Sequence, residues 1–215
     1  MNLGYCVFNS GGYAIYTQDF EVIRQALAWC EAGETPWLCT VIAAYGSSPR
    51  PVGSLLVALA NGQQTGSLSG GCVEEDLLTR LHGGEFDGKG CQRVEYGISA
   101  EDSERLGLPC GGRMEILVQP LTNTDSNWLA TILTALNERQ CVVRQLGLAA
   151  GDTSITPSNR YRDLQLEPGQ LKQWFGPSMR LLLVGAGQLA QSLAELPPPL
   201  GGSLQSALHA IQSQA

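Results

Sequence analysis

One segment, residues 66–75, holds the residue types best suited to chemistry. Three glycines and two serines lead directly into Cys72, where the pattern predicts that a helix begins. A helix start leaves backbone N–H groups without internal partners, and glycine lets a ligand approach that backbone closely. A thiol in this position can have a lowered pKa. The segment therefore predicts an anion cradle beside a reactive sulfur; the alternative is a glycine-rich turn with a buried cysteine.

Two further loops have a similar character. Residues 46–51 contain Arg50 between two prolines, and residues 108–112 form a glycine-rich turn that bears Cys110. Each loop adjoins a predicted strand, so the three loops meet at one rim if the strands pair in one sheet. The planar guanidinium of Arg50 can then donate paired hydrogen bonds to a phosphate or to the polar edge of a heterocycle. Cys72 and Cys110 can face the same ligand as soft donors.

Each of these residues also has a purely structural interpretation. Arg50 can be an ordinary surface arginine, and Cys110 a small core residue, because free cysteine is commonly buried. Glu74 and Glu75 suit the positive end of a helix dipole better than a role as catalytic acids. His82 fits the end of the same helix. No residue is assigned a catalytic role.

The elements that must position these loops follow from periodicity and turn residues. Helices are predicted from the cap Asp19 to Gly33, over 72–81, over 100–106 and over 126–139. Strands are predicted over 36–44, 54–59, 63–67, 92–98, 114–120, 141–148 and 179–184. The polar residues 151–176 are either a hairpin region or a linker. Residues 1–18 show only weak periodicity.

Composition narrows the class of protein. The 215 residues are 43% apolar and 15% charged, which is enough for a packed core in one or two domains. The net charge of −7 and the lack of a Lys/Arg run argue against a general nucleic-acid surface. No apolar run reaches the roughly 18–20 residues of a membrane span, and the N-terminus lacks signal-peptide features. Seven cysteines without a CxxC pair favour free thiols in a reducing cytoplasm and argue against a zinc site.

A dinucleotide-like motif occurs late in the chain, where Gly185, Gly187 and Ala190 follow an apolar strand. A productive fingerprint also needs a second strand and then an acidic residue about 20 residues further on. The sequence instead continues through prolines and glycines into a polar tail from Gly201, in which no second strand is visible. We therefore expect no productive binding of NAD(P). We also expect an apolar strand over residues 179–184 that has no neighbours.

Four motifs in order make the chain resemble the XdhC/CoxI family, the xanthine dehydrogenase accessory factors. They are residues 45–53 (YGSSPRPVG), 66–74 (GSLSGGCVE), 109–112 (PCGG) and 183–187 (LVGAG). The resemblance implies an α/β protein in which an α+β N-terminal domain precedes a Rossmann-like domain. It also implies a molybdenum cofactor chaperone, not an enzyme with turnover. Such a chaperone binds molybdopterin as cargo while a cysteine desulfurase partner supplies its sulfido ligand, and delivers it to a xanthine dehydrogenase-type hydroxylase.

Carried onto this sequence, the resemblance implies a division into residues 1–125, a connecting region 126–178 and a truncated Rossmann-like segment 179–215. It implies cofactor binding by the following residues of the first three motifs: Ser48, Arg50, Ser69, Gly70, Gly71, Cys72, Glu74, Cys110, Gly111 and Gly112. Cys72 and Cys110 are the candidate contacts to molybdenum, and a homodimer is a further expectation. An NAD(P)-dependent oxidoreductase and a non-functional family remnant are the alternatives.

Overall fold

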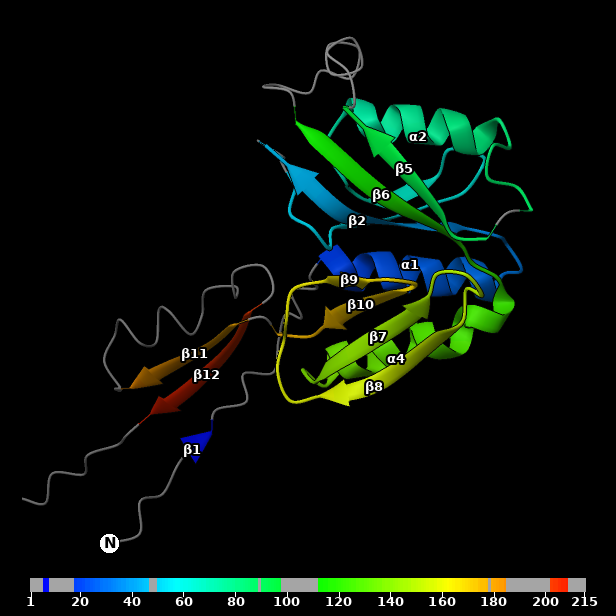
Figure 1. Cartoon of the computed structure of the whole chain (residues 1–215). Coiled ribbons are helices and arrows are strands. Elements are labelled where there is room, and N and C mark those ends of the chain that lie inside the picture. Colours follow the sequence, from blue (N-terminus) through cyan, green and yellow to red (C-terminus); the bar gives the residue numbers. More distant parts are fainter. Residues whose placement is uncertain are drawn as a thin grey trace, which may run out of the picture.

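The computed structural model describes residues 6–7, 18–46, 50–88, 90–97, 112–177, 179–184 and 202–208. For residues 6–7, Cys72, 179–184 and 202–208, the description is limited to the backbone. The fold is mixed α/β, as expected, and the described residues form three sheets, with helices packed against two of them (Figure 1).

The first sheet is antiparallel throughout and has the strand order β4-β3-β2-β6-β5. Its strands are β2 (Trp37–Tyr45), β3 (Leu55–Ala58), β4 (Gln64–Gly66), β5 (Gln92–Tyr96) and β6 (Arg113–Pro120). The first six residues of β2 are all buried, because both faces of this central strand are covered. This explains why its sequence is a continuous apolar run instead of an alternating one.

Helices cover the two faces of this sheet (Figure 1). On one face, α2 (Cys72–His82) buries Leu77 and Leu81 against side chains of the strands such as Val41. On the other face, α1 (Gln18–Glu31) and α4 (Ser126–Asn137) pack together. A short 3₁₀ turn, η2 (Asn123–Asp125), leads into α4.

The second sheet has the order β8-β7-β10-β9 and is also antiparallel. Its strands are β7 (Cys141–Gly147), β8 (Thr153–Ser158), β9 (Gln165–Glu167) and β10 (Gln170–Phe175). Residues 151–176 therefore form strands that pair as hairpins and not a linker. Phe175 of β10 shares a core with Leu38 of β2, so this sheet packs with the first one.

A buried arginine joins the two sheets. The guanidinium of Arg144 on β7 donates to the side-chain oxygen of Gln173 on β10 at 3.2 Å and to that of Gln119 on β6. It also lies 4.7 Å from the centre of the Trp128 ring of α4. Burial lowers the pKa of Arg144 to about 10, well within the charged range at neutral pH. The two amide oxygens thus solvate a charge that holds β6, β7 and β10 together.

The third sheet corrects the sequence interpretation of the C-terminal residues. Strand β11 (Met179–Val184) pairs in parallel with β12 (Gly202–Leu208), and β1 (Cys6–Val7) pairs with the other side of β12. The predictions that no second strand follows and that residues 179–184 have no neighbour are therefore wrong. Side-chain patterning did not identify β12, because pairing rests on backbone hydrogen bonds that a polar sequence also supplies.

Two smaller points concern the helices. Helix α1 begins at Gln18, so Asp19 lies in its first turn and is not its cap. The helix predicted over residues 100–106 lies outside the described residues.

Candidate functional site

The strand ends place the predicted loops at one edge of the first sheet, which we call the rim. Strand β2 ends at Tyr45, which pairs with Arg113 at the start of β6. Near the start of β3, Leu56 pairs with Gly66 at the end of β4. Because neighbouring strands are antiparallel, these ends lie on the same side of the sheet. A Cβ on Gly46 would lie 3.5 Å from the Cα of Gly112, so the first and third motifs meet in space.

Gly66 begins the second motif at a point where only glycine fits. Its φ is +102°, a conformation that residues with a side chain rarely adopt. A Cβ there would lie 2.3 Å from the carbonyl oxygen of Leu55 and 2.6 Å from Cγ2 of Val22. This close approach lets the chain leave β4 tightly against β3 and α1, and directs it toward the start of α2.

The cradle predicted for an external anion is occupied by a carboxylate of the same chain, that of Glu74. The N–H groups of residues 68–70 donate to Oε1 at distances of 2.8, 2.7 and 2.7 Å, and the N–H of Gly71 donates to Oε2 at 3.0 Å. The Ser67 hydroxyl donates to Oε1 at 2.9 Å, and the Ser69 hydroxyl donates to Oε2. The sequence interpretation that these N–H groups await a ligand therefore needs revision.

Glu74 behaves electrostatically as a fixed anion. Burial by itself would raise its pKa, but the hydrogen bonds from residues 69–71 outweigh burial and lower the pKa to about 2. The side chain is only 7% exposed, so this charge is held inside the protein near the positive end of α2. Glu74 thus fixes the five residues that precede Cys72, and Cys72 opens α2 as predicted.

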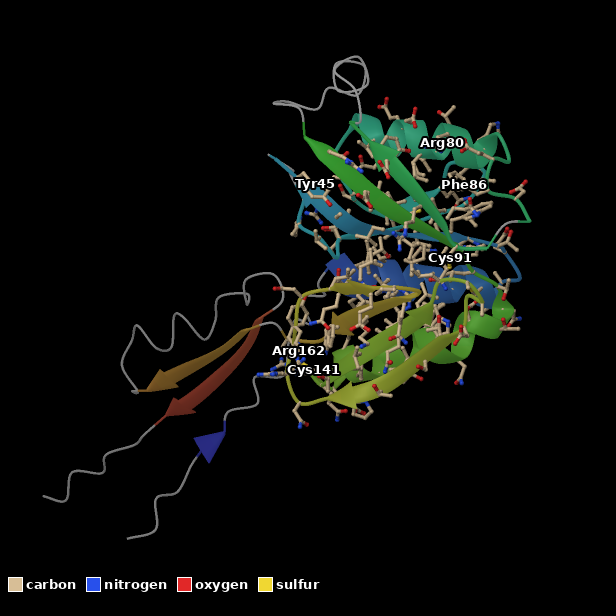
Figure 2. The ribbon with its side chains drawn as sticks, in the orientation of Figure 1. Tyr45, Arg80, Phe86, Cys91, Cys141 and Arg162 are labelled. Carbon is tan, nitrogen blue, oxygen red and sulfur yellow. The ribbon has the colours of Figure 1, made fainter. Side chains whose placement is uncertain are left out.

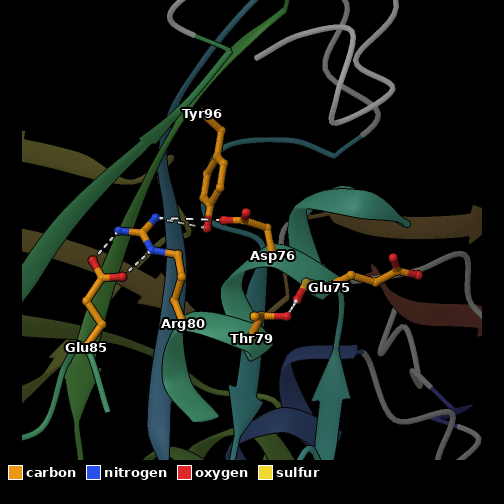
Figure 3. Close-up of polar contacts among 6 residues, drawn as sticks. All are labelled: Glu75, Asp76, Thr79, Arg80, Glu85 and Tyr96. Carbon is orange, nitrogen blue, oxygen red and sulfur yellow. Dashed lines mark hydrogen bonds and ion pairs between the residues drawn. The ribbon is translucent and has the colours of Figure 1, made fainter. Parts of the chain in front are cut away.

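The far end of α2 is tied to β5 through Arg80 (Figure 3). Its guanidinium makes two hydrogen bonds to Glu85, at 2.8 and 2.6 Å, and a longer one to the Tyr96 hydroxyl at 3.4 Å. The ring of Phe86 lies 5.4 Å from the guanidinium. The bonds to Glu85 raise the pKa of Arg80 further. Held at both ends, α2 is a rigid support for the second motif.

Arg50, the predicted ligand-binding arginine, is half-buried at the rim beside the start of α1. Burial raises the pKa of Asp19 to about 6, and the positive charge of Arg50 limits that rise. The same loop touches the second sheet, because the side-chain amide of Gln173 donates to the carbonyl of Gly53 at 3.3 Å. The rim therefore borders residues that the sequence interpretation assigned to a connecting region.

The structure describes part of the predicted site. Arg50, Ser69, Gly70, Gly71, Glu74 and Gly112 are described, as is the backbone of Cys72. Ser48, Cys110 and Gly111 lie outside the described residues, as do Gly185, Gly187 and Ala190 of the dinucleotide-like motif. The described residues contain no group of three or more His, Cys, Asp or Glu side chains able to hold a metal ion.

Four other cysteines have described side chains, and these are in packing positions. Cys30 and Cys39 are buried, whereas Cys91 and Cys141 are half-buried. Burial raises the pKa of Cys30 to about 11 and raises that of Cys39 further. The thiols of Cys30 and Cys39 are therefore protonated at neutral pH, unlike a nucleophilic thiolate.

Residues 29–97 match the XdhC and CoxI family, a span that includes the first two motifs. The resemblance seen in the sequence is thereby confirmed. The chain is 27% identical over 190 residues to "Molybdenum cofactor insertion chaperone PaoD" of Escherichia coli (strain K12), covering 87% of this chain and 58% of that protein. It is 25% identical over 209 residues to a probable xanthine dehydrogenase subunit of Bacillus subtilis (strain 168), covering 86% of this chain and 62% of that protein.

A solved structure shows the same fold. A crystal structure described as a xanthine dehydrogenase from Bacillus halodurans superposes with a TM-score of 0.59 at 22% identity, over 79% of this chain and 56% of that one. This chain therefore spans about three fifths of the length of these similar proteins. No helix among the described residues has the length and apolar character needed to cross a bilayer.

Proposed function

We propose that this chain is an accessory chaperone that binds the molybdenum cofactor at the rim and hands it to a xanthine dehydrogenase-type hydroxylase. The observation that carries the proposal is the convergence of the family motifs at one sheet edge, where Gly46 and Gly112 approach closely. A relative that is 27% identical to this chain over 190 residues is named as a cofactor insertion chaperone. A cysteine desulfurase is the proposed source of the sulfido ligand, and turnover by this chain itself is not part of the proposal.

The rim residues fit such a cargo in a specific way. Arg50 offers a planar set of donors that suits a phosphate or a pterin edge. We assign the soft sulfur for the thiophilic metal to Cys72, at the start of α2, and to Cys110, which lies two residues before Gly112 in the sequence. Gly70 and Gly71 are assigned a different part from the one first predicted, because their N–H groups already bind Glu74. They hold the segment before Cys72 in place instead of binding the cargo.

The proposal is tested by mixing the purified full chain with molybdopterin cofactor and measuring cofactor retained on gel filtration together with bound molybdenum. We expect retention by the wild type and weaker retention by Arg50→Gln and Cys72→Ala. Arg93→Gln is the matched control for charge, since Arg93 is exposed on the edge strand β5. Cys91→Ala is the control for a thiol away from the rim, since Cys91 precedes β5 at the end opposite Tyr96.

A wild-type chain that retains no cofactor would overturn the proposed function. Retention that is equal in Arg50→Gln, Cys72→Ala and both controls would overturn the assigned site while leaving the function intact.

The parallel pair β11–β12 bears on whether the chain binds a dinucleotide, because β12 is the second strand that the sequence interpretation did not find. The fingerprint also requires an acid near the end of that strand, to bind the ribose hydroxyls. β12 ends at Leu208 and is followed by His209, and residues 202–215 contain no Asp or Glu. We therefore keep the proposal that the chain does not bind NAD(P) productively. A titration that shows micromolar binding of NAD or NADP would contradict it.

A further inference from the structure

A phosphate-bearing ligand at the rim needs hydrogen-bond donors, and the most obvious ones are taken. The N–H groups of residues 68–71 all donate to Glu74, whose low pKa keeps it charged at neutral pH. A second anion placed there would meet a carboxylate at close range, which is unfavourable in a partly buried site. The anionic end of the ligand must therefore be bound by side chains, either Arg50 itself or other cations near the rim.

The loop between β8 and β9 provides such groups. Residues 160–165 line an open hollow of about 410 Å³, formed by Arg160, Tyr161, Arg162, Asp163, Leu164 and Gln165. Arg160 and Arg162 are both exposed, and the hollow carries their two guanidinium groups against one carboxylate. In a chain with a net charge of −7, this is an unusual local balance.

Within the described part of the chain, neither arginine has a carboxylate within 4.0 Å. Several other cations do form such ion pairs: Arg24, Arg80, Arg113 and Lys172. Arg162 lies over the Trp174 ring at 5.9 Å, a contact that orients the guanidinium and leaves its N–H donors available. The donors of both residues are therefore open to an external anion.

The backbone of this loop is held in place before any ligand arrives. The Ser158 hydroxyl donates to the carbonyl of Arg160 at 2.7 Å and accepts a hydrogen bond from the Trp174 indole at 3.2 Å. Because Trp174 also lies beneath Arg162, one buried ring supports both arginines. A site whose loop is already ordered loses less entropy when it binds a ligand.

The hollow adjoins the rim. A Cβ on Gly53, in the first motif, would lie 4.0 Å from Cβ of Leu164. Burial raises the pKa of the Tyr161 hydroxyl, and the negative charge of Asp19 raises this pKa further. The positive charge of Arg50 in turn acts on the pKa of Asp19, so Asp19 links the hollow electrostatically to the rim. Figure 2 shows Arg162 on the same side of the molecule as Tyr45, at the rim end of β2.

We propose that Arg160 and Arg162 form a second subsite that binds the phosphate group of the ligand held at the rim. Paired guanidinium groups suit a phosphate ester or a pyrophosphate, since each can donate two parallel hydrogen bonds to an anion. Tyr161, 36% exposed between them, offers a ring and a hydroxyl to the adjoining part of the ligand. The inference rests on the proposed function, because that function supplies the phosphate-bearing ligand.

The test uses the full chain and the double variant Arg160→Gln/Arg162→Gln. We expect the variant to weaken binding of molybdopterin cofactor at least about tenfold, because two charge-assisted contacts are lost. Arg93→Gln, which removes one exposed charge elsewhere, should stay within twofold. Inorganic phosphate and pyrophosphate are added as competitors, and the stronger competitor indicates whether the subsite takes a single phosphate or a pyrophosphate.

Two results separate failure of this inference from failure of the proposed function. If the wild type binds cofactor and the double variant binds it within twofold, the subsite is overturned and the function stands. If the wild type binds no cofactor, the proposed function is overturned, and titration with pyrophosphate alone decides the subsite. A rise in the wild-type melting temperature that the double variant lacks supports it, and the same response in both proteins overturns it.

Discussion

Replacing Glu74 with glutamine tests whether the internal carboxylate organises the segment before Cys72. Glutamine keeps one acceptor oxygen, but its NH₂ group takes the place of Oε2, which accepts from the Gly71 N–H at 3.0 Å. Two donors then face each other, and the charge that strengthens every other bond is lost. The pKa of Glu74 falls from 4.5 to about 2 on folding, which corresponds to about 3 kcal/mol of stabilisation at pH 7.

The sign of the pH dependence follows from the depressed pKa. The stabilisation by Glu74 is fully present above pH 4.5 and is lost as the pH falls toward 2. The free energy of unfolding of Glu74→Gln should therefore lie about 3 kcal/mol below that of the wild type at pH 7, and only roughly 1.5 kcal/mol below it at pH 3. Urea unfolding at both pH values measures the difference.

The neighbouring substitution Glu75→Gln is the matched control. Glu75 is exposed, and its side chain points away from the polar contacts of α2 in Figure 3. Its effect should stay within about 0.5 kcal/mol. If Glu74→Gln also unfolds within about 0.5 kcal/mol of the wild type at pH 7, the carboxylate does not hold this segment and the reasoning is refuted.

Two further predictions concern the elements around the rim. Gly66→Ala should lower the free energy of unfolding by about 3 kcal/mol or more, because the new Cβ meets the Leu55 carbonyl at a positive φ; denaturant unfolding that shows a loss below about 1 kcal/mol would contradict this. Asp19→Asn should stabilise the protein by up to about 3 kcal/mol at pH 8, because the pKa of Asp19 rises from 3.8 to about 6 on folding. The pKa of Asp19 is raised to about 6, so wild-type stability falls as the pH rises from 4 through 6, and thermal unfolding should show this slope vanish in the variant.

Much of the fold around the rim follows from local sequence patterns. Turn residues and apolar periodicity located the strands of the first sheet and the helix that opens at Cys72 within a few residues. These patterns are reliable here because each element buries one face or both faces in a regular way. The second sheet was predicted only in part, since the polar residues 151–176 fit a linker as well as a hairpin region.

The use of each polar group at the site could not be predicted in the same way. Glu74 was placed correctly in the first turn of α2, but the return of its carboxylate to residues 67–71 depends on the tight turn at Gly66. The basic loop around Tyr161 carried a signal, two arginines that flank an aromatic residue. Its importance appears only from its position, because Gly53 and Leu164 are far apart in sequence and adjacent in space.

The sequence by itself determined the family resemblance, the main elements of the first sheet and the order of the motifs, because these depend on residue type and short spacing. The tertiary structure decided which donors are free and which segments meet. A backbone N–H donates to the acceptor that the fold places next to it, and for residues 68–71 that acceptor is the Glu74 carboxylate. The parallel pairing of β11 with β12 likewise depends on backbone N–H and C=O groups, a pair that every residue except proline carries. No pattern of side chains therefore predicts this pairing.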